Sequence, residues 1–167
     1  MIRPAEPRDV PVILALIREL ARYEKLEHEA VATEAQIRES LFGQTPAHAE
    51  VLVVDPPDAG RVVGFALFFH NYSTFLGRRG LYLEDLFVLP EWRRRGYGAA
   101  LLRRLARIAI DRGCGRLEWS VLAWNEPALR FYESLGAKLM VDWRICRVVR
   151  DDMERLVTGE ADEAHRA

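Results

Sequence analysis

The chain has 167 residues, a length that fits one domain with a buried core. Half of its residues are hydrophobic and 29% are charged, a composition that excludes an intrinsically disordered chain. The formal net charge of −1 gives no electrostatic case for nucleic acid, and no apolar run reaches the ~18 residues of a membrane span.

Cysteine, histidine and the amino-terminal residues narrow the protein class further. The start, MIRPAEPRD, is charged and interrupted by proline, unlike a secretory signal peptide. Cys114 and Cys146 stand alone and form neither a disulfide framework nor a C-x-x-C site. The histidines show no metal-ligand spacing. We expect a cytoplasmic protein with no metal, no membrane partner and no nucleic-acid partner.

Periodicity and turn signals predict the elements of the first half of the chain. A capping box formed by Thr33 and Gln36 begins the second helix, and DPPDAG between two strands predicts a hairpin. Asp9 is the expected N-cap of the first helix. The expected order is strand, helix, helix and three strands, at residues 1–5, 10–24, 33–43, 50–54, 61–72 and 81–89.

The second half of the chain alternates helices and strands. An amphipathic helix follows the 81–89 strand and ends before Gly113, and another lies between Asn125 and Gly136. Residues 116–123 and 138–149 are expected to be strands, the latter range holding two, and 151–157 a last helical turn. The whole order predicts a mixed sheet with helices on its faces, in a single domain over residues 1–157 with a flexible tail at 158–167.

The turn RRRGYGAALL, between the 81–89 strand and its following helix, predicts an anion-binding site. A helix N-terminus offers unpaired backbone N–H groups, and Gly96 and Gly98 allow a ligand to approach the backbone closely. A solvated surface turn is the plain alternative. A Rossmann turn requires Gly or Ala where Leu101 stands, and a Walker A loop requires a Gly-Lys-Ser/Thr that is absent.

The turn also has the form R-x-x-G-x-G, and together with the segments LYLEDLFVLPEWR and WNEPALRFYESLGA it resembles the GNAT (GCN5-related N-acetyltransferase) superfamily. Within it, the chain is similar to the diamine/polyamine (spermidine/spermine) and thialysine acetyltransferases, from Ile2 to about Leu156. The resemblance implies an α/β (α+β) GNAT fold, whose mostly antiparallel twisted sheet has six to seven strands with about four helices on its faces. It also implies acetyl-CoA as co-substrate, and a homodimer.

The same resemblance assigns roles to residues. Tyr132 would protonate the departing coenzyme thiolate, and Asn125 would cap its helix and contact pantetheine. In the 81–89 strand, Leu86, Phe87 and Val88 would pair with pantetheine through their backbone. One of their N–H groups would polarise the thioester carbonyl. The residues implied in coenzyme binding are Leu86, Phe87, Val88, Arg93, Arg94, Arg95, Gly96, Tyr97, Gly98, Ala99, Asn125 and Tyr132.

Two adjacent acids, Glu84 and Asp85, interrupt an apolar strand and should point to opposite faces by the period of two. Buried carboxylates are costly without partners, so they form either a strand-edge ion pair or a substrate site. An ammonium must lose a proton before it can attack a thioester, so we expect Glu84, or a water, to take that proton and one or both acids to bind the amine.

The resemblance adds Tyr23, Glu24 and Trp143 to the substrate site; a solvated helix end and core packing are their structural alternatives. The polyamine enzymes carry an acid and a tryptophan where this chain has Ser73, Thr74 and Phe75. A short diamine or a lysine-like amino acid is therefore as well supported as a long polyamine. The function expected is acetyl transfer to a small primary amine; acetylation of a protein or peptide amine, and a non-catalytic acyl-CoA sensor, are the alternatives.

Overall fold

The computed structural model describes residues 1–159 of the chain. These residues form two compact units, one of Met1–Asn125 and a second that begins at Glu126. The predicted tail at 158–167 lies outside the described residues, apart from Thr158 and Gly159.

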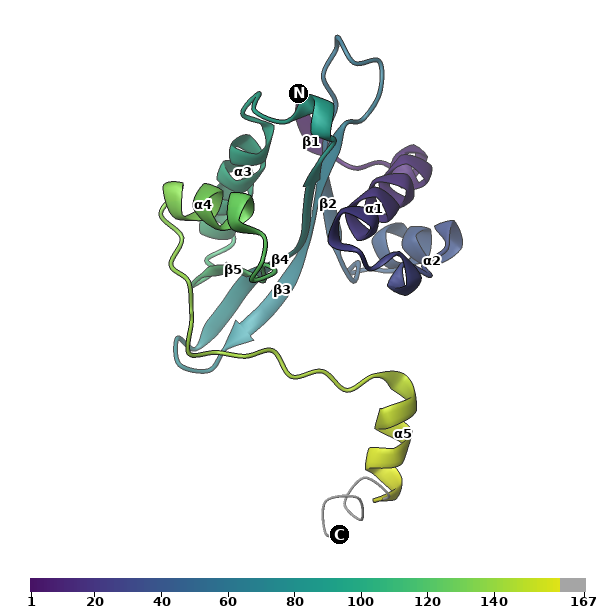
Figure 1. The fold of residues 1–167 in the computed structure, drawn as a ribbon, viewed down its shortest axis with the longest axis vertical. Coiled ribbons are helices and arrows are strands. Elements are labelled where there is room, and N and C mark those ends of the chain that lie inside the picture. The colour runs from purple at the N-terminus through teal and green to yellow at the C-terminus, as the bar shows by residue number, and fades with distance from the viewer. Residues whose placement is uncertain (160–167) are drawn as a thin grey trace. The chain divides into compact units, whose positions relative to one another are not determined.

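A five-stranded sheet in the order β1-β2-β3-β4-β5 forms the centre of the first unit (Figure 1). Neighbouring strands are antiparallel except β4 and β5, which are parallel. The mixed, mostly antiparallel sheet is therefore confirmed, with fewer strands than the predicted six to seven. Its strands are β1 (Ile2–Pro4), β2 (Glu50–Val54), β3 (Gly64–Ser73), β4 (Arg78–Val88) and β5 (Leu117–Trp119).

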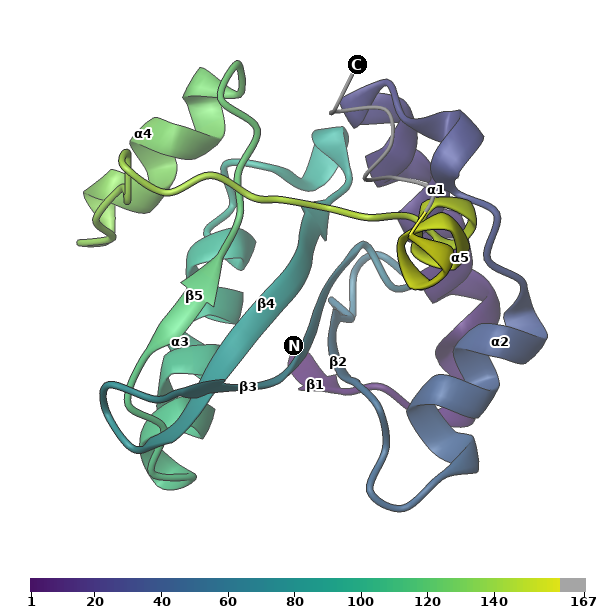
Figure 2. The same cartoon turned by 90° about the horizontal axis from the view of Figure 1, so that it is seen from below.

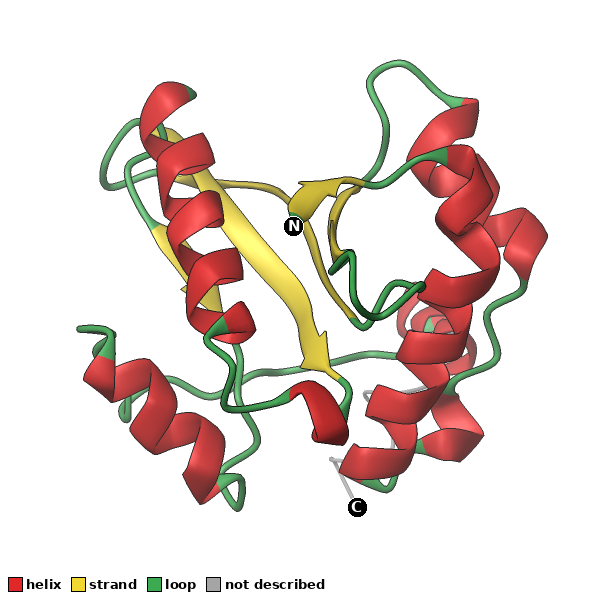
Figure 3. Ribbon diagram, turned by 90° about the horizontal axis from the view of Figure 1, so that it is seen from above, coloured by secondary structure: helices red, strands yellow, loops and turns green. Residues whose placement is uncertain are grey.

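Helices cover both faces of this sheet. Figure 2 and Figure 3 show α3 on one side of it, and α1 and α2 on the other. The helices of the first unit are α1 (Val10–Glu24), α2 (Glu34–Arg38, continued by a π-helical turn Glu39–Gly43) and α3 (Tyr97–Asp111). The second unit contains α4 (Glu126–Ser134) and α5 (Arg150–Thr158). No helix within residues 1–159 is long and apolar enough to cross a bilayer.

The apolar stripes read from the sequence are the packed faces of the helices. Ile13 and Leu16 of α1 are buried in one cluster with Phe65 of β3 and Phe87 of β4. On α3, Leu101 and Leu105 are fully buried. Burial of each such side chain contributes roughly 1.5–3 kcal/mol, so these stripes fix both helices against the sheet.

Two capping predictions had different outcomes. Thr33 and Gln36 form the expected capping box. Asp9 directly precedes α1, but its carboxylate makes no bond to that helix. It accepts hydrogen bonds from the Arg3 guanidinium at 2.7 and 3.0 Å and from the Glu6 N–H at 2.7 Å. Asp9 is therefore the N-cap residue of α1 as predicted, but its carboxylate oxygens are taken up by Arg3 and the Glu6 N–H and do not cap the helix N–H groups.

The predicted strands at residues 138–149 are absent from the described structure. Residues 140–149 are exposed, begin with a turn closed by the Trp143 N–H and the Met140 carbonyl, and make no strand pairing within residues 1–159. The alternating Val141, Trp143 and Ile145 gave a strand pattern, but a strand forms only beside a hydrogen-bonding neighbour. β5 likewise ends at Trp119, earlier than the predicted end at Ala123. The helix predicted for residues 151–157 is confirmed as α5.

Candidate active site

The turn between β4 and α3 presents backbone donors that no helical carbonyl can use. Gly96 is the N-cap of α3, in the left-handed region at φ 82°. The N–H of Ala100 makes the first bond of the helix, to the Gly96 carbonyl at 3.0 Å. The N–H groups of Tyr97, Gly98 and Ala99 precede it and have no acceptor inside the helix. They fit the oxygens of a pyrophosphate, together with the positive end of the helix macrodipole.

Arg94 also adopts a left-handed conformation, with φ 61°. For a residue with a side chain this region costs about 1–2 kcal/mol. Such strain often marks a functional turn, since the surrounding structure must hold it in place. Two left-handed residues within three positions, Arg94 and Gly96, shape this turn, and no sequence pattern predicts that conformation for Arg94.

The three consecutive arginines of the turn lie in different environments. Arg93 donates from Nε to the Val88 carbonyl at 2.9 Å, and its guanidinium carbon lies 4.9 Å from the centre of the Tyr23 ring. Arg95 stacks over Trp92, with 4.3 Å to the ring centroid. None of the three forms an ion pair within the described part of the chain. Their positive charge is therefore not neutralised by a neighbouring acid of residues 1–159.

β4 is paired on both sides in its first part and on one side in its last part. Its pairing with β5 ends where Leu83 lies opposite Trp119, whereas its pairing with β3 continues to Val88. Leu86, Phe87 and Val88 thus have no strand beside them on the β5 side within residues 1–159. A strand edge of this kind fits an extended ligand that carries amide groups, such as pantetheine.

A β-bulge at Glu84 separates the two parts of β4. Leu83 pairs with Phe68 and Asp85 with Leu67, so Glu84 is an extra residue. The predicted strict alternation through Glu84 and Asp85 was therefore wrong. Downstream of the bulge, Asp85 shares a face with Phe87, which packs in the cluster that contains residues of α1. The bulge turns Asp85 toward the α1 side of the sheet.

Asp85 lies near two other acids, Glu84 and Glu24. Burial and the negative charges of Glu84 and Glu24 raise the pKa of Asp85 to about 7. Burial also raises the pKa of Glu24, the last residue of α1. None of these three carboxylates has an ion pair or a hydrogen bond to any side chain within residues 1–159. The predicted ion pair is thus not formed there, and the cluster attracts a cation because each carboxylate repels the others.

Tyr23, next to Glu24, is held between the turn and the residues that precede α4. Its hydroxyl donates to the Asn125 amide oxygen at 3.1 Å, and its ring lies 6.1 Å from that of Trp124. Asn125 is buried. The first unit therefore brings together the predicted turn, the β4 residues, Tyr23, Glu24 and Asn125. The bond between Tyr23 and Asn125 was not foreseen, since it joins positions 102 residues apart.

Two predicted site residues belong to the second unit. Tyr132 on α4 is 9% exposed, and its ring packs against that of Phe131 at 5.3 Å between centroids. Trp143 lies in the extended segment after α4 and is 72% exposed, so it has no core-packing role in the structure. Because the units are described separately, these two residues remain predictions as parts of the site.

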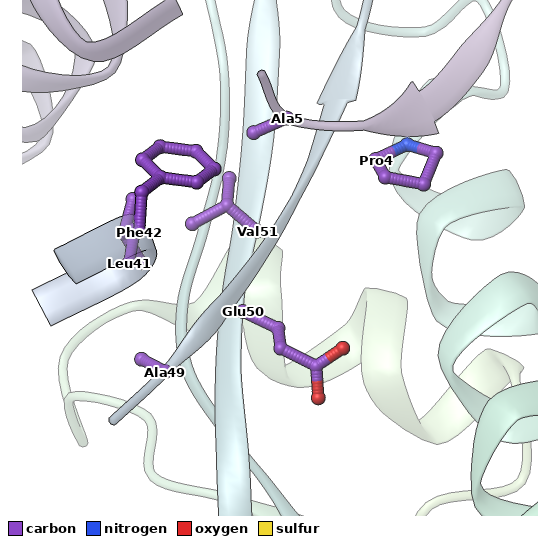
Figure 4. Close-up of a pocket in the computed structure, with 7 residues that line it drawn as sticks. All are labelled: Pro4, Ala5, Leu41, Phe42, Ala49, Glu50 and Val51. Carbon is purple, nitrogen blue, oxygen red and sulfur yellow. The ribbon is translucent and has the colours of Figure 1, made fainter. Parts of the chain in front are cut away.

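A separate hollow with about 360 Å³ of empty space lies elsewhere in the first unit (Figure 4). Glu50 is its charged residue, and the Arg112 guanidinium binds that carboxylate with Nη2 at 2.7 Å from Oε2. Since its charge is already compensated, the hollow is not a second candidate for the cation site. Its lining is otherwise apolar or backbone and comes from Pro4, Ala5, Leu41, Phe42, Ala49 and Val51.

Two curated relatives that match most of the chain are named acetyltransferases. The chain is 40% identical to a thialysine N-epsilon-acetyltransferase of Bos taurus, over 93% of this chain and 96% of the relative. It is 34% identical to an L-ornithine N5-acetyltransferase of Arabidopsis thaliana, over 93% of this chain and 86% of the relative.

A solved structure and a family model agree with these relatives. The crystal structure of a Trypanosoma brucei acetyltransferase matches with a TM-score of 0.71 and 26% identity, over 90% of this chain and 99% of that one. The model of the acetyltransferase (GNAT) family matches residues 14–137, which hold the turn, β4 and the acids. The chain therefore belongs to the GNAT family and is an acyltransferase.

Proposed function

We propose that the protein transfers the acetyl group of acetyl-CoA to a primary amine of a small cationic acceptor: a diamine, a polyamine, thialysine or a lysine-like amino acid. One observation carries this proposal. Asp85 of β4 lies near the charges of Glu84 and Glu24, and none of the three carboxylates has a cation partner within residues 1–159. Neighbouring carboxylates repel one another, and a bound ammonium relieves that repulsion.

Two features favour an acceptor with few ammonium groups. The relatives are named for thialysine and for L-ornithine, which are amino acids with a terminal amine. The loop Ser73–Phe75 offers no acid, and Phe75 at its tip is 94% exposed. A long polyamine would therefore lack one anionic contact here.

Acetyl-CoA supplies the activated thioester, and the residues of the chain supply donors, acceptors and orientation. The N–H groups of Tyr97, Gly98 and Ala99 bind the pyrophosphate, with Arg93–Gly96 shaping the turn. Leu86, Phe87 and Val88 offer their backbone to the pantetheine arm, and one of their N–H groups stabilises the charge that develops on the carbonyl oxygen.

Proton transfers complete the reaction without an acyl-enzyme. The acceptor ammonium gives its proton to an acid of the cluster, directly or through water, and its nitrogen then bonds to the acetyl carbon. As the carbon–sulfur bond breaks, Tyr132 gives its phenolic proton to the sulfur. The second proton, which the nitrogen loses on becoming an amide, passes through water to the Tyr132 phenolate and restores the phenol. We assigned the base to Glu84 from the sequence. A pKa of about 7 makes Asp85 the better-matched acceptor near neutral pH.

The test is a thiol-release assay with acetyl-CoA against thialysine, L-ornithine, spermidine, 1,3-diaminopropane and a peptide with a free N-terminus. We expect turnover of at least one small amine, and a fall in kcat of about 100-fold or more in Tyr132→Phe. Turnover of the peptide alone would favour a protein N-acetyltransferase. Coenzyme binding with no turnover of any amine would favour an acyl-CoA sensor. Either result would overturn the proposal.

A homodimer in the cytoplasm is part of the same proposal. Several large apolar side chains of the second unit are exposed, among them Trp143 and Ile145 at 72% and 71%. Exposed apolar surface of this kind is commonly covered by a partner chain. Light scattering after gel filtration tests the assembly, and a mass of one chain, near 19.2 kDa, would contradict it.

A further inference from the structure

The side chain of Arg93 points away from the turn and contacts residues of β4 and α1. Its Nε donates to the carbonyl of Val88, the last residue of β4, at 2.9 Å. Its guanidinium carbon lies 4.9 Å from the ring centroid of Tyr23 and 5.4 Å from that of Phe87. Its own N–H is bound to the Pro90 carbonyl at 3.2 Å. Backbone and side chain together hold Arg93 against β4 and α1.

Through Tyr23, Arg93 reaches the acceptor side of the site. Tyr23 precedes Glu24, whose charge contributes to the raised pKa of Asp85. The helix that carries both residues ends at Lys25, in a left-handed conformation. Tyr23 is also bonded to Asn125 through its hydroxyl. Arg93 therefore contacts the helix residue that precedes Glu24, whereas the neighbouring Arg95 stacks on Trp92.

We propose that Arg93 is a positioning residue that couples coenzyme binding at the turn to amine binding at Glu24, Glu84 and Asp85. The inference rests on the proposed function, because it requires an amine at these acids. Its physical basis is that one planar side chain contacts both the strand that leads into the turn and the helix end that carries an acid. A ligand that fixes the turn then fixes Tyr23 and Glu24 as well.

Linkage makes the coupling measurable without turnover. If coenzyme A tightens amine binding by some factor, the amine must tighten coenzyme A binding by the same factor. Coenzyme A carries no acetyl group, so both ligands can be bound together at equilibrium. The dissociation constant of coenzyme A is measured by calorimetry with and without saturating thialysine, and in parallel with spermidine.

In the wild type we expect the amine to tighten coenzyme A binding by about 5- to 10-fold, within the usual range for coupled sites. Arg93→Met removes the Nε donor and the charge, and Arg93→Lys keeps the charge but loses the planar stack and the Nε bond. We expect the factor to fall below about 2 in both variants, with each ligand still binding by itself. Arg104→Met, on the exposed face of α3, is the matched control and keeps the wild-type factor.

The kinetic counterpart is a rise in the KM of the amine that exceeds the change in the affinity of coenzyme A alone. A merely structural role would lower both affinities together with the thermal midpoint, which is measured on each variant. An unchanged coupling factor in folded Arg93→Met and Arg93→Lys overturns the inference while the wild type still acetylates the amine. If the wild type neither binds nor acetylates thialysine or spermidine, the proposed acceptor class fails, and the inference fails with it.

Discussion

The two parts of β4 differ in how they are paired. One part serves the folding of the sheet, and the other is available for binding ligands. Leu81–Leu83 lie between β3 and β5 with hydrogen bonds on both sides, and Leu81 and Leu83 are almost fully buried. Leu86–Val88 pair with β3 alone, and Asp85 and Glu84 lie between the two parts. The first part completes the sheet, whereas the second leaves backbone groups and carboxylates available to ligands.

Replacing the carboxylate of Asp85, the residue after the bulge, should have the largest effect on catalysis. Asp85→Asn keeps the size of the side chain but can neither balance an ammonium nor accept a proton. We expect kcat/KM for the amine to fall about 100- to 1000-fold, and the rise of kcat/KM through about pH 7 to disappear. The coenzyme A dissociation constant should stay within about 2-fold, because the turn is untouched. Steady-state kinetics and calorimetry check the two halves of this prediction.

Asp58→Asn, in an exposed turn of the first unit, is the matched control and should keep wild-type kinetics. A loss of coenzyme affinity as large as the loss of kcat/KM in Asp85→Asn would show that the acids and the turn do not act separately.

Asp85→Asn should also change how the stability of the protein depends on pH. The pKa of Asp85 is raised from 3.8 to about 7, so the folded protein keeps a proton that the unfolded chain releases above pH ~4. The contribution of Asp85 to stability is therefore fully present below the unfolded pKa and is lost as pH rises through about 7. At pH 8 we expect Asp85→Asn to be more stable than the wild type by about 2–4 kcal/mol.

Urea unfolding at pH 5 and at pH 8 measures this difference. The advantage of the variant should shrink at pH 5, where the folded wild type holds most of that proton. An advantage of the same size at both pH values would mean that ionisation of Asp85 is not its source.

A smaller effect is expected from a substitution in the turn, where we propose that coenzyme A binds to backbone N–H groups. Gly98→Val places a branched side chain in the first turn of α3, at the donors proposed for the pyrophosphate. We expect the affinity for coenzyme A to fall about 10- to 100-fold with no loss in thermal midpoint, because valine is no worse than glycine in a helix. Calorimetry and thermal melts measure the two quantities.

Gly98→Ala provides the graded comparison for this position and should fall between valine and the wild type. Full coenzyme affinity in Gly98→Val would place the phosphate site elsewhere.

The smallest effect should come from the backbone at the end of α1. Lys25 has φ 62°, a conformation that glycine adopts without penalty. Lys25→Gly should raise stability by about 0.5–1 kcal/mol, or roughly 1–4 °C in melting temperature. Differential scanning calorimetry detects such a shift. A lower melting temperature would show that the lysine side chain contributes more than the strain costs.

The parts of the site made of backbone were predictable from the sequence, because glycine spacing and helix periodicity describe backbone directly. The turn, α3 and the β4 residues all lie where these patterns indicated. Two adjacent acids in an apolar strand also predicted an ion pair or a substrate site at Glu84 and Asp85. The bulge that aims Asp85 depends on pairing with β3, and no local pattern contains that information.

Side-chain contacts account for what the patterns did not indicate. Arg93 was predicted to bind the coenzyme as part of the turn, and no pattern indicated that its side chain also contacts Tyr23, 70 positions away along the chain. The carboxylate of Asp9, the N-cap residue of α1, binds Arg3 rather than the N–H groups of the helix. In residues 138–149 apolar and polar side chains alternate as in a strand. Such alternation indicates which side chains share a face, but it does not supply the neighbouring strand that must hydrogen-bond to the segment.

The bulge has a consequence for how the acceptor specificity of such a chain can change during evolution. Deleting a residue at a regular position of β4 would turn every later side chain to the opposite face. Glu84 is the exception, because Leu83 and Asp85 already face consecutive residues of β3. A one-residue deletion or insertion at this point keeps the later pairs in register. The number of acids beside the acceptor can therefore vary between descendants of one ancestor while the sheet that carries them stays intact.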